Sequence, residues 1–222
     1  MLTFIPAEMA DPAPYRLLTS IVAPRPIAWV STVNDRGVPN LAPFSFFNAV
    51  AGFPPTIMFS VSYRRAEPRE KHTLRNARAT GEFVCHIVDE DSAAAMILSA
   101  VDWPDELNEI ALLGLPVVNC DEVRPPRIAG APVAMECRVT QIIPVEGATN
   151  VMVLGRVLRF HIEESLYRPE MGLVDTVKMR PITRLGGAVE YTRIGELIHL
   201  EVPSLEKAGR ELHEYQRDQS RC

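Results

Sequence analysis

The chain has 222 residues, enough for one large domain whose core needs no disulfides. Hydrophobic residues make up 47% of it and charged residues 23%, values that exclude a disordered, collagen-like or coiled-coil protein. The net charge of -5 argues against a dedicated nucleic-acid binder, because such a protein needs a basic face to displace counterions.

Cysteines and targeting signals give little indication of metal, disulfide or membrane chemistry. The four cysteines are scattered and form no C-x-x-C pair, so we expect neither a zinc site nor a disulfide frame. The amino terminus has no basic region followed by an apolar run, and no segment approaches the roughly 20 apolar residues of a membrane span. We therefore expect a cytoplasmic protein with reduced thiols.

The first half of the chain reads as strands with one short helix. Strands are predicted at 26–33, 38–50, 54–62 and 83–88, and a helix at 70–80. The turn residues of NDRG, at 34–37, predict a hairpin between the first two strands. Pro39 and Pro43 cannot donate ladder hydrogen bonds, so the second strand must be an edge or bulged strand.

The second half is helical at first and then returns to strands. A helical pattern runs from 90 to 114 and ends at Gly114, and strands at 133–145 and 150–162 are joined by the hairpin signal EGATN. A further segment at 181–191 closes the fold. We predict one domain over 1–222, with a core at about 15–191 and a charged, helical tail at 192–222.

These elements favour a mainly β protein. Hairpin-like joins between strands, with helices inserted instead of alternating, predict an antiparallel barrel with attached helices and not a parallel sheet. Gly155, Gly186 and Gly187 do not form a G-x-G-x-x-G motif, so a bound nucleotide would be held by other means.

One basic segment is a candidate phosphate site. Residues 63–78 hold six basic residues against two acidic ones, a net charge of +4 (Arg64, Arg65, Arg69, Lys71, Arg75 and Arg78 against Glu67 and Glu70). The segment opens a helix whose first amides are unpaired, and Thr73 adds a hydroxyl, which together suit a phosphate. The alternative is a solvated charged loop.

Hydroxyl and aromatic residues gather near the ends of the predicted strands. The hydroxyls are those of Ser31, Thr32, Ser45, Ser60 and Ser62, and the aromatic residues are Trp29 and the phenylalanines of 44–47. A ligand that is flat at one end and anionic at the other would suit this set together with the basic segment, and FMN has that shape. Each serine taken alone is equally an ordinary turn or strand residue.

Six segments in order resemble one known family. PRPIAWVST, NLAPFSFFNAV, PPTIMFSVS, KHTLRNARATGEFV, VLGRVLRFHI and PITRLGG with Tyr191 are similar to the pattern of the flavin reductase-like, FMN-binding split-barrel proteins, from about Tyr15 to Tyr191. The resemblance implies an antiparallel Greek-key split β-barrel with inserted helices, a homodimer, and FMN bound near the subunit interface.

The resemblance also implies roles for particular residues. Trp29, Ser31 and Thr32 would line the flavin; Ser45, Phe46 and Asn48 would lie against its ring and ribityl chain; Ser60 and Ser62 would lie near the ribityl-phosphate end; Lys71 and Thr73 would bind the phosphate. His72 departs from the family, which often has an acidic residue at this position. It would either add a phosphate donor or alter the loop.

Gly155, Arg156 and His161 correspond to the region where a nicotinamide stacks on the flavin in related reductases. Gly155 would allow close approach and Arg156 would meet a pyrophosphate. Two alternatives stay open: Gly155 accommodates a β-bulge or a close strand crossing, and His161 is a surface or packing residue.

Hydride transfer from a nicotinamide to a flavin needs stacking and orientation, because the cofactor carries the chemistry. We therefore expect no catalytic side chain. The first hypothesis is an NAD(P)H-dependent FMN reductase that supplies reduced FMN to a separate monooxygenase. The second is a flavoredoxin-like electron carrier without nicotinamide turnover, and the third is a flavin-binding barrel without redox turnover. Sequence does not choose between NADH and NADPH.

Overall fold

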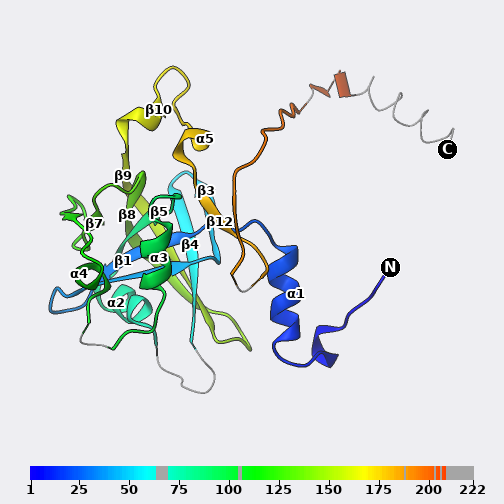
Figure 1. The fold of residues 1–222 in the computed structure, drawn as a ribbon, viewed down its shortest axis with the longest axis horizontal. Helices are drawn as coiled ribbons and strands as arrows, with labels where there is room; N and C mark the ends of the chain where they lie inside the picture. Colours follow the sequence, from blue (N-terminus) through cyan, green and yellow to red (C-terminus); the bar gives the residue numbers. More distant parts are fainter. Residues whose placement is uncertain (64–69, 105–106, 188, 203, 206, 209–222) are drawn as a thin grey trace.

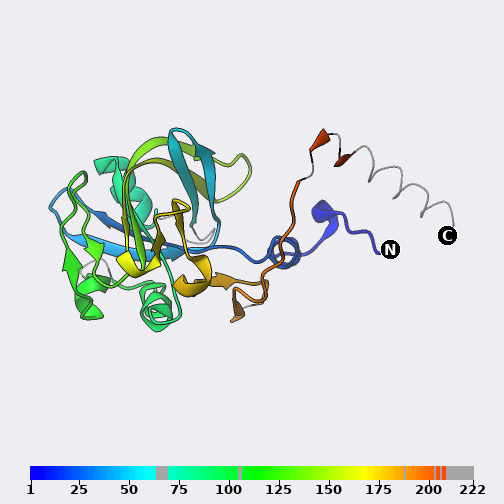
Figure 2. The same ribbon diagram turned by 90° about the horizontal axis from the view of Figure 1, so that it is seen from above.

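The computed structural model describes residues 1–63, 70–104, 107–187, 189–202, 204–205 and 207–208. Its body is one curled antiparallel sheet with helices around it, and the amino-terminal residues and residues 194–202 extend to one side of that body (Figures 1 and 2). The seven strands of the sheet are β1 (Ala28–Val33), β2 (Pro39–Phe44), β3 (Phe47–Gly52), β4 (Pro55–Ser62), β5 (Glu82–Ile87), β8 (Val133–Pro144) and β9 (Asn150–Ile162).

The strand order explains why the sheet closes into a barrel. The order is β2-β1-β5-β8-β9-β4-β3, and every neighbouring pair is antiparallel. The two outer strands, β2 and β3, are consecutive in the chain and only Ser45 and Phe46 separate them. The two outer strands must therefore lie close together, and the Ser60 amide donates to the Phe46 carbonyl at 2.8 Å. The predicted antiparallel barrel is confirmed.

The expectation of a single strand over 38–50 is wrong in one respect. This segment forms two strands at opposite ends of the sheet order, and the break is at Ser45 and Phe46. Pro39 and Pro43 lie in the outer strand β2, which pairs with β1 alone within the sheet as described. Their missing donors are tolerated there, as the sequence predicted.

Helices cover the barrel at several points. They are η1 (Pro6–Glu8), α1 (Ala13–Ile21), α2 (His72–Thr80), α3 (Ala93–Ser99), α4 (Glu109–Leu112), η2 (Glu164–Leu166) and α5 (Thr176–Met179). The helix predicted at 70–80 is confirmed, and it ends at Gly81 in the left-handed conformation with φ +70°. The predicted helical stretch at 90–114 contains two helices, α3 and α4. Helix α1 had no counterpart in the sequence prediction.

Short strand pairs complete the fold. They are β6 (Val117–Val118) with β7 (Arg127–Ile128), β10 (Tyr167–Arg168) with β11 (Leu173–Val174), and β12 (Ile182–Arg184) with β13 (Tyr191–Arg193). The segment predicted at 181–191 is thus a small hairpin. After β13, residues 194–202 are extended and not helical, and most of the remaining predicted tail lies outside the described residues.

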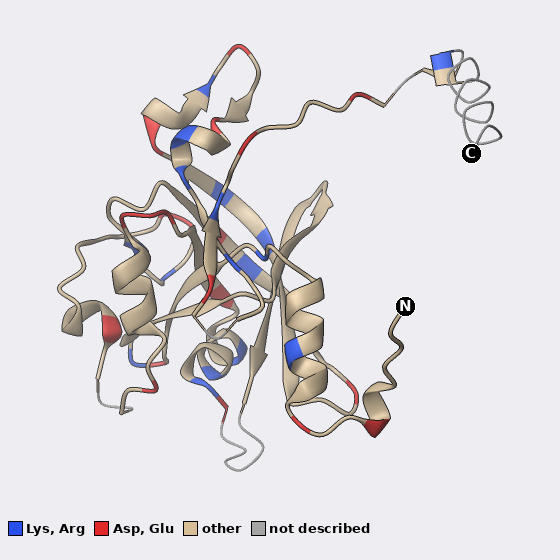
Figure 3. Ribbon diagram, turned by 45° about the vertical axis from the view of Figure 1, so that its right-hand side comes forward, with Lys and Arg blue, Asp and Glu red and all other residues tan. Residues whose placement is uncertain are grey.

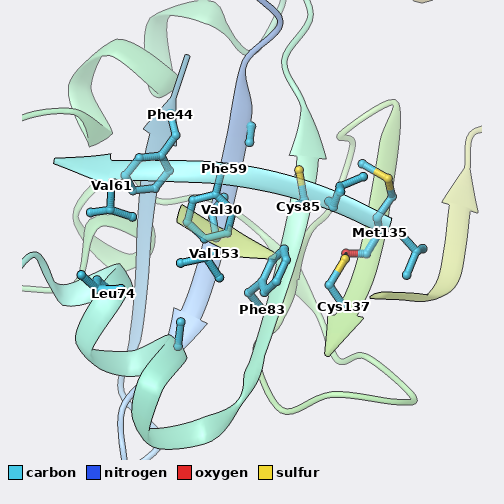
Figure 4. Close-up of a cluster of buried hydrophobic side chains, with 14 of the residues drawn as sticks. Val30, Phe44, Phe59, Val61, Leu74, Phe83, Cys85, Met135, Cys137 and Val153 are labelled. Atoms are coloured by element: carbon cyan, nitrogen blue, oxygen red, sulfur yellow. The ribbon is translucent and has the colours of Figure 1, made fainter. Parts of the chain in front are cut away.

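Two of the three apolar clusters among the described residues lie on the two sides of β1. The first fills the barrel, where Val30, Phe59 and Phe83 meet Leu74 from α2 (Figure 4). The second lies outside β1 and β2, where Trp29 and Leu41 pack against residues of α3 and α4. Strand β1 is therefore covered on both faces, and all six of its residues are buried. Among the described helices, none is long and apolar enough to cross a membrane.

Candidate functional site

A cavity of about 350 Å³ lies at the amino end of α2. Its walls come from Asn40 and Ala42 of β2, Tyr63, the start of α2 with the residue before it, the segment 99–104, and Glu109. Lys71, His72 and Thr73, the residues predicted at the phosphate, all line it. The structure therefore brings three of the predicted site residues to one hollow.

The start of α2 offers hydrogen-bond donors to this cavity. Lys71 is the amino cap of α2, its side chain makes no capping hydrogen bond, and the first turn of the helix contains no acidic residue. The first amides of a helix have no partner within the helix and lie at the positive end of its dipole, so they favour an anion. Thr73 is buried, and its hydroxyl oxygen accepts a hydrogen bond from the Asn40 side chain at 3.0 Å.

Acidic residues lie near the basic residues of α2 (Figure 3), and some of them moderate the positive charge of the cavity. The Lys71 Nζ lies 3.4 Å from a carboxylate oxygen of Asp102, and Arg78 pairs with Glu70 at 2.9 Å. Glu109 is buried and accepts a hydrogen bond from the Leu41 amide at 3.1 Å, and burial raises the pKa of its carboxyl group. An anion here would have to compete with Asp102 for Lys71. Arg64, Arg65, Glu67 and Arg69 of the predicted basic segment lie outside the described residues.

Trp29, Ser31 and Thr32 have structural contacts and no exposed surface for a ligand. The indole of Trp29 donates to the Ser99 hydroxyl at 2.8 Å. The Ser31 hydroxyl donates to the Pro126 carbonyl at 2.6 Å, and the Thr32 hydroxyl accepts from the side-chain amide of Asn76 at 3.1 Å. These contacts join β1 to three other parts of the fold. All three side chains are buried, and their expected contact with a flavin stays a prediction; in the structure Trp29 supports Ser99, which forms a wall of the cavity.

Ser45 and Phe46 lie where the chain passes from β2 to β3. The Phe46 ring is 6.4 Å from that of Tyr15 in α1, and the Arg25 guanidinium lies 5.9 Å from the Phe46 ring centre. Asn48 is exposed, and its side chain accepts a hydrogen bond from the Ala49 amide at 2.9 Å. These three residues remain predicted flavin contacts, and none of them lines the cavity.

Ser60 and Ser62 point away from the barrel interior. On β4, Ile57, Phe59 and Val61 are buried in the core, so the serines between and after them face outward. The Ser60 hydroxyl accepts from the Asn150 side chain at 3.1 Å, and Ser62 is exposed. Ser62 directly precedes Tyr63, a residue of the cavity wall.

The space beside Gly155 is filled by a core side chain, and the expected nicotinamide contact stays a prediction. A Cβ at this position would lie 2.3 Å from Cζ and 2.4 Å from Cε1 of Phe83, so the ring of a core residue occupies the space expected for a nicotinamide. Gly155 pairs with Val139 beside a register shift in β8, which supports the alternative of a bulge and a close approach. Arg156 is exposed on the opposite face of β9.

His161 belongs to a network around a buried carboxylate. Its Nε2 lies 2.6 Å from Glu136, which is fully buried and also accepts hydrogen bonds from the amides of Asp121 and Glu122 at 3.2 and 2.7 Å. Burial alone would raise the pKa of Glu136, but the hydrogen bonds outweigh it and hold the pKa below its usual value. A packing role for His161 accounts for this geometry.

The residues of the cavity wall that sequence reasoning missed include Asn40, Ser99, Asp102 and Glu109. Asp102 and Glu109 are acidic residues next to apolar ones in the predicted helical stretch. This was the signal in the sequence that could have indicated a role in a site. Among the described residues, no group of histidine, cysteine and acidic side chains could hold a metal ion.

Comparisons with known proteins agree with this architecture. Residues 21–180 match the model of the flavin reductase like domain. An uncharacterized protein of Halalkalibacterium halodurans is 37% identical over 204 residues, which cover 90% of this chain and 96% of that protein.

Two solved structures combine high structural similarity with more than 30% identity. Component B of nitrilotriacetate monooxygenase from Bacillus cereus has a TM-score of 0.85 and 38% identity, over 90% of this chain and 98% of that one. The 2-nitrobenzoate 2-nitroreductase NbaA of Pseudomonas fluorescens has a TM-score of 0.81 and 31% identity, over 92% and 98%.

More distant structures share the fold alone. A split barrel domain protein from Shewanella frigidimarina has a TM-score of 0.79 at 14% identity, over 91% of this chain and 100% of that one. Flavoredoxin of Desulfovibrio vulgaris has a TM-score of 0.69 at 23% identity, over 81% and 91%. The split-barrel architecture expected from the sequence is confirmed.

Proposed function

Because this chain belongs to the flavin reductase-like family, we propose that it is an FMN reductase that uses NADH or NADPH and supplies reduced FMN to a separate monooxygenase. The observation that carries the proposal is the cavity at the amino end of α2, with its lysine, its histidine and the first amides of the helix. The similarity to a component of a two-part monooxygenase supports the proposed partner.

The residues of the cavity fit the phosphate end of FMN. Lys71 and the first amides of α2 would hold the phosphate, and His72 is placed beside them. The buried Trp29–Ser99 hydrogen bond would keep the opposite wall in place. Asp102 and Glu109 add negative charge, so Lys71 and the first amides of α2 would have to offset it for a phosphate to bind.

Bound FMN would supply the hydride-accepting chemistry, so the protein needs to bind and orient and not to transfer protons itself. Phe46 and Tyr15 provide an aromatic surface near the crossing from β2 to β3, and the buried Arg25 guanidinium lies beside the Phe46 ring. We propose this surface, with Ser45 and Asn48, for the ring end of the flavin. The nicotinamide would approach from outside the barrel, since Phe83 blocks the approach at Gly155.

The sequence identities to solved structures favour a reductase over an electron carrier. The monooxygenase component shares 38% of its residues with this chain, whereas the flavoredoxin shares 23% and carries only the fold. The nitroreductase, at 31% identity, adds a nitroaromatic compound as an alternative electron acceptor that the same assay can include.

We also propose a homodimer. Leu18 and Ile21 of α1, Val50 of β3 and Phe53 after it are exposed, and Phe53 has 96% of its surface accessible. Apolar surface of this kind on a folded chain indicates an interface. Sedimentation at micromolar concentration tests this point, and a monomer would contradict it.

The decisive assay follows oxidation of NADH and of NADPH with FMN, without oxygen, and separates free from bound reduced flavin by rapid filtration. Turnover with release of reduced FMN supports the reductase. One equivalent of bound flavin and no nicotinamide oxidation would instead support the carrier. Adding 2-nitrobenzoate distinguishes a nitro acceptor from free flavin.

A pair of lysine variants tests the phosphate assignment. Lys71→Ala should weaken FMN binding by about tenfold and leave riboflavin, which has no phosphate, unchanged. Lys178→Ala, in α5 at the other end of the body (Figure 1), is the matched control and should change neither. Equal losses for FMN and riboflavin would refute the phosphate site.

A further inference from the structure

Strand β3 has an unusual free edge. It is the last strand of the sheet, and among the described residues it pairs with β4 alone. Its sequence, FNAVAG, contains neither a charged residue nor a proline, and every residue after Phe47 is exposed. Natural proteins block such an edge with charges, prolines or a covering segment, because it invites another strand to pair.

The segment after β13 has the pattern of a strand without a sheet. Residues 194–202 run away from the body as an extended chain (Figures 1 and 2). Ile198, Leu200 and Val202 alternate with His199 and Glu201, which is the period-2 pattern of a half-buried strand. Yet the three apolar side chains are 80%, 88% and 96% exposed. This segment, 194–202, is called the arm below.

We propose that residues 198–202 of the arm of one chain add as a further strand to the free edge of β3 in a second copy of this chain. The proposal rests on the homodimer included in the proposed function, and it names the segments that the two subunits exchange. Pairing of this kind would satisfy main-chain groups of both segments and cover the three apolar side chains.

The fold places the arm on the side where a second copy would dock. Arg25, just after α1, makes a backbone bridge to Arg184 of β12, and its guanidinium donates to the carbonyls of Val22 and Leu185 at 2.8 and 2.9 Å. The arm leaves from β13, the partner of β12, so it starts beside α1 and its exposed Leu18 and Ile21. A copy packed against α1 would lie within reach of an extended arm, whose nine residues span about 30 Å.

Charge and symmetry agree with exchange between two copies. The arm carries Glu196 and Glu201, and β3 has no acidic residue to repel them. In a two-fold dimer each arm would cover the edge of the other subunit, so both free edges are used and the assembly closes without further growth. The same arm bound to its own chain would leave the apolar face of the second copy uncovered.

Site-directed cross-linking between two differently tagged chains tests the exchange. In a background of Cys120→Ser and Cys222→Ser, one chain carries Glu201→Cys in the arm and the other carries Ala51→Cys in β3. A short bis-maleimide should join the two tags. Arg36→Cys, on the exposed turn between β1 and β2, replaces Ala51→Cys as the control and should give no product. A chain that carries both arm and edge cysteines and cross-links only within itself would overturn the proposal.

Sedimentation on three variants gives a second, independent readout. Removal of residues 196–222 and Leu200→Asp should each weaken the dimer by about tenfold or more, while His199→Asp, on the other face of the arm, should change it less than about threefold. A dimer that survives both changes without arm cross-links refutes the exchange and leaves the proposed dimer standing. A wild-type monomer with normal NADH-dependent flavin reduction refutes both the dimer and the exchange, but not the reductase.

Discussion

Replacing Gly155 with alanine should destabilise the protein without acting on a ligand site. The added Cβ would lie 2.3 and 2.4 Å from two ring carbons of Phe83 and 3.3 Å from the Cβ of Cys137, whereas carbon atoms in contact lie about 3.5–4.0 Å apart. Phe83 is fully buried and packs edge to face on Phe59, with the ring centres 5.1 Å apart, so it has little room to move.

The expected loss is about 2–3 kcal/mol of unfolding free energy, the range for overpacking a tight core. For a chain of 222 residues this corresponds to a melting temperature lowered by about 5–10 °C. The matched control is Gly52→Ala, because a Cβ there meets nothing within 4 Å. It should change the unfolding free energy by less than about 0.5 kcal/mol.

A double-mutant cycle with Phe83→Leu identifies the cause. If the clash is with the ring, Gly155→Ala should cost less by about 1 kcal/mol or more when residue 83 is leucine. Urea denaturation of the four proteins measures this coupling, with FMN affinity and NADH oxidation followed in parallel. A Gly155→Ala protein as stable as wild type that has lost nicotinamide oxidation would refute the reasoning and return Gly155 to the site.

Three further changes test the site and the core. Asp102→Asn should tighten FMN binding by about two- to fivefold and leave riboflavin binding unchanged, because an exposed ion pair that competes for Lys71 is worth less than about 1 kcal/mol; titration of both flavins checks this. Trp29→Phe removes the hydrogen-bond donor to Ser99 and should lower the unfolding free energy by about 1 kcal/mol. Flavin affinity should stay within about twofold of wild type. A large loss of flavin affinity at unchanged stability would contradict the place of Trp29 behind the cavity wall. His86 accepts from the Ile128 amide at 3.0 Å and lies 2.8 Å from the Trp29 carbonyl, and burial lowers its pKa from 6.5 to about 4. As the pH falls, His86 takes up a proton in the unfolded chain before it does so in the folded one. The unfolding free energy should therefore fall by up to about 3 kcal/mol as the pH drops from about 6.5 to 4. His86→Gln should flatten this decline, as measured by urea titrations across the same pH window.

The barrel could be predicted from the sequence because its signals are local. The segments that became β5, β8 and β9 are rich in branched residues and bounded by turns, and the edge position of β2 followed from two prolines. The break at Ser45 and Phe46 could not be predicted in the same way. Both sides of it are apolar and extended, and only the closure of the barrel, held by the Ser60 to Phe46 hydrogen bond, separates them into two strands.

The site was predictable only where its parts are neighbours in the chain. Lys71, His72 and Thr73 open one helix, so a local pattern located all three. Asp102 and Glu109 reach the same cavity from a segment about thirty residues later, and no spacing in the sequence links them to α2. The charge of the site therefore differs from that of the basic segment alone.

The partners of Gly155 and of the β1 hydroxyls within the fold could not be predicted from the sequence, for a common physical reason. A glycine in a strand indicates that something approaches closely, and a serine or threonine near a strand end indicates a polar contact, but neither names the partner. Here the partners are Phe83 across the barrel, the Pro126 carbonyl and Asn76 of α2, all of them far away in sequence. Strand β1 is covered on both faces, so its alternation does not separate a ligand-facing side from a core-facing one. A ligand and a distant part of the same chain impose the same local pattern, and the three-dimensional neighbours are what distinguish them.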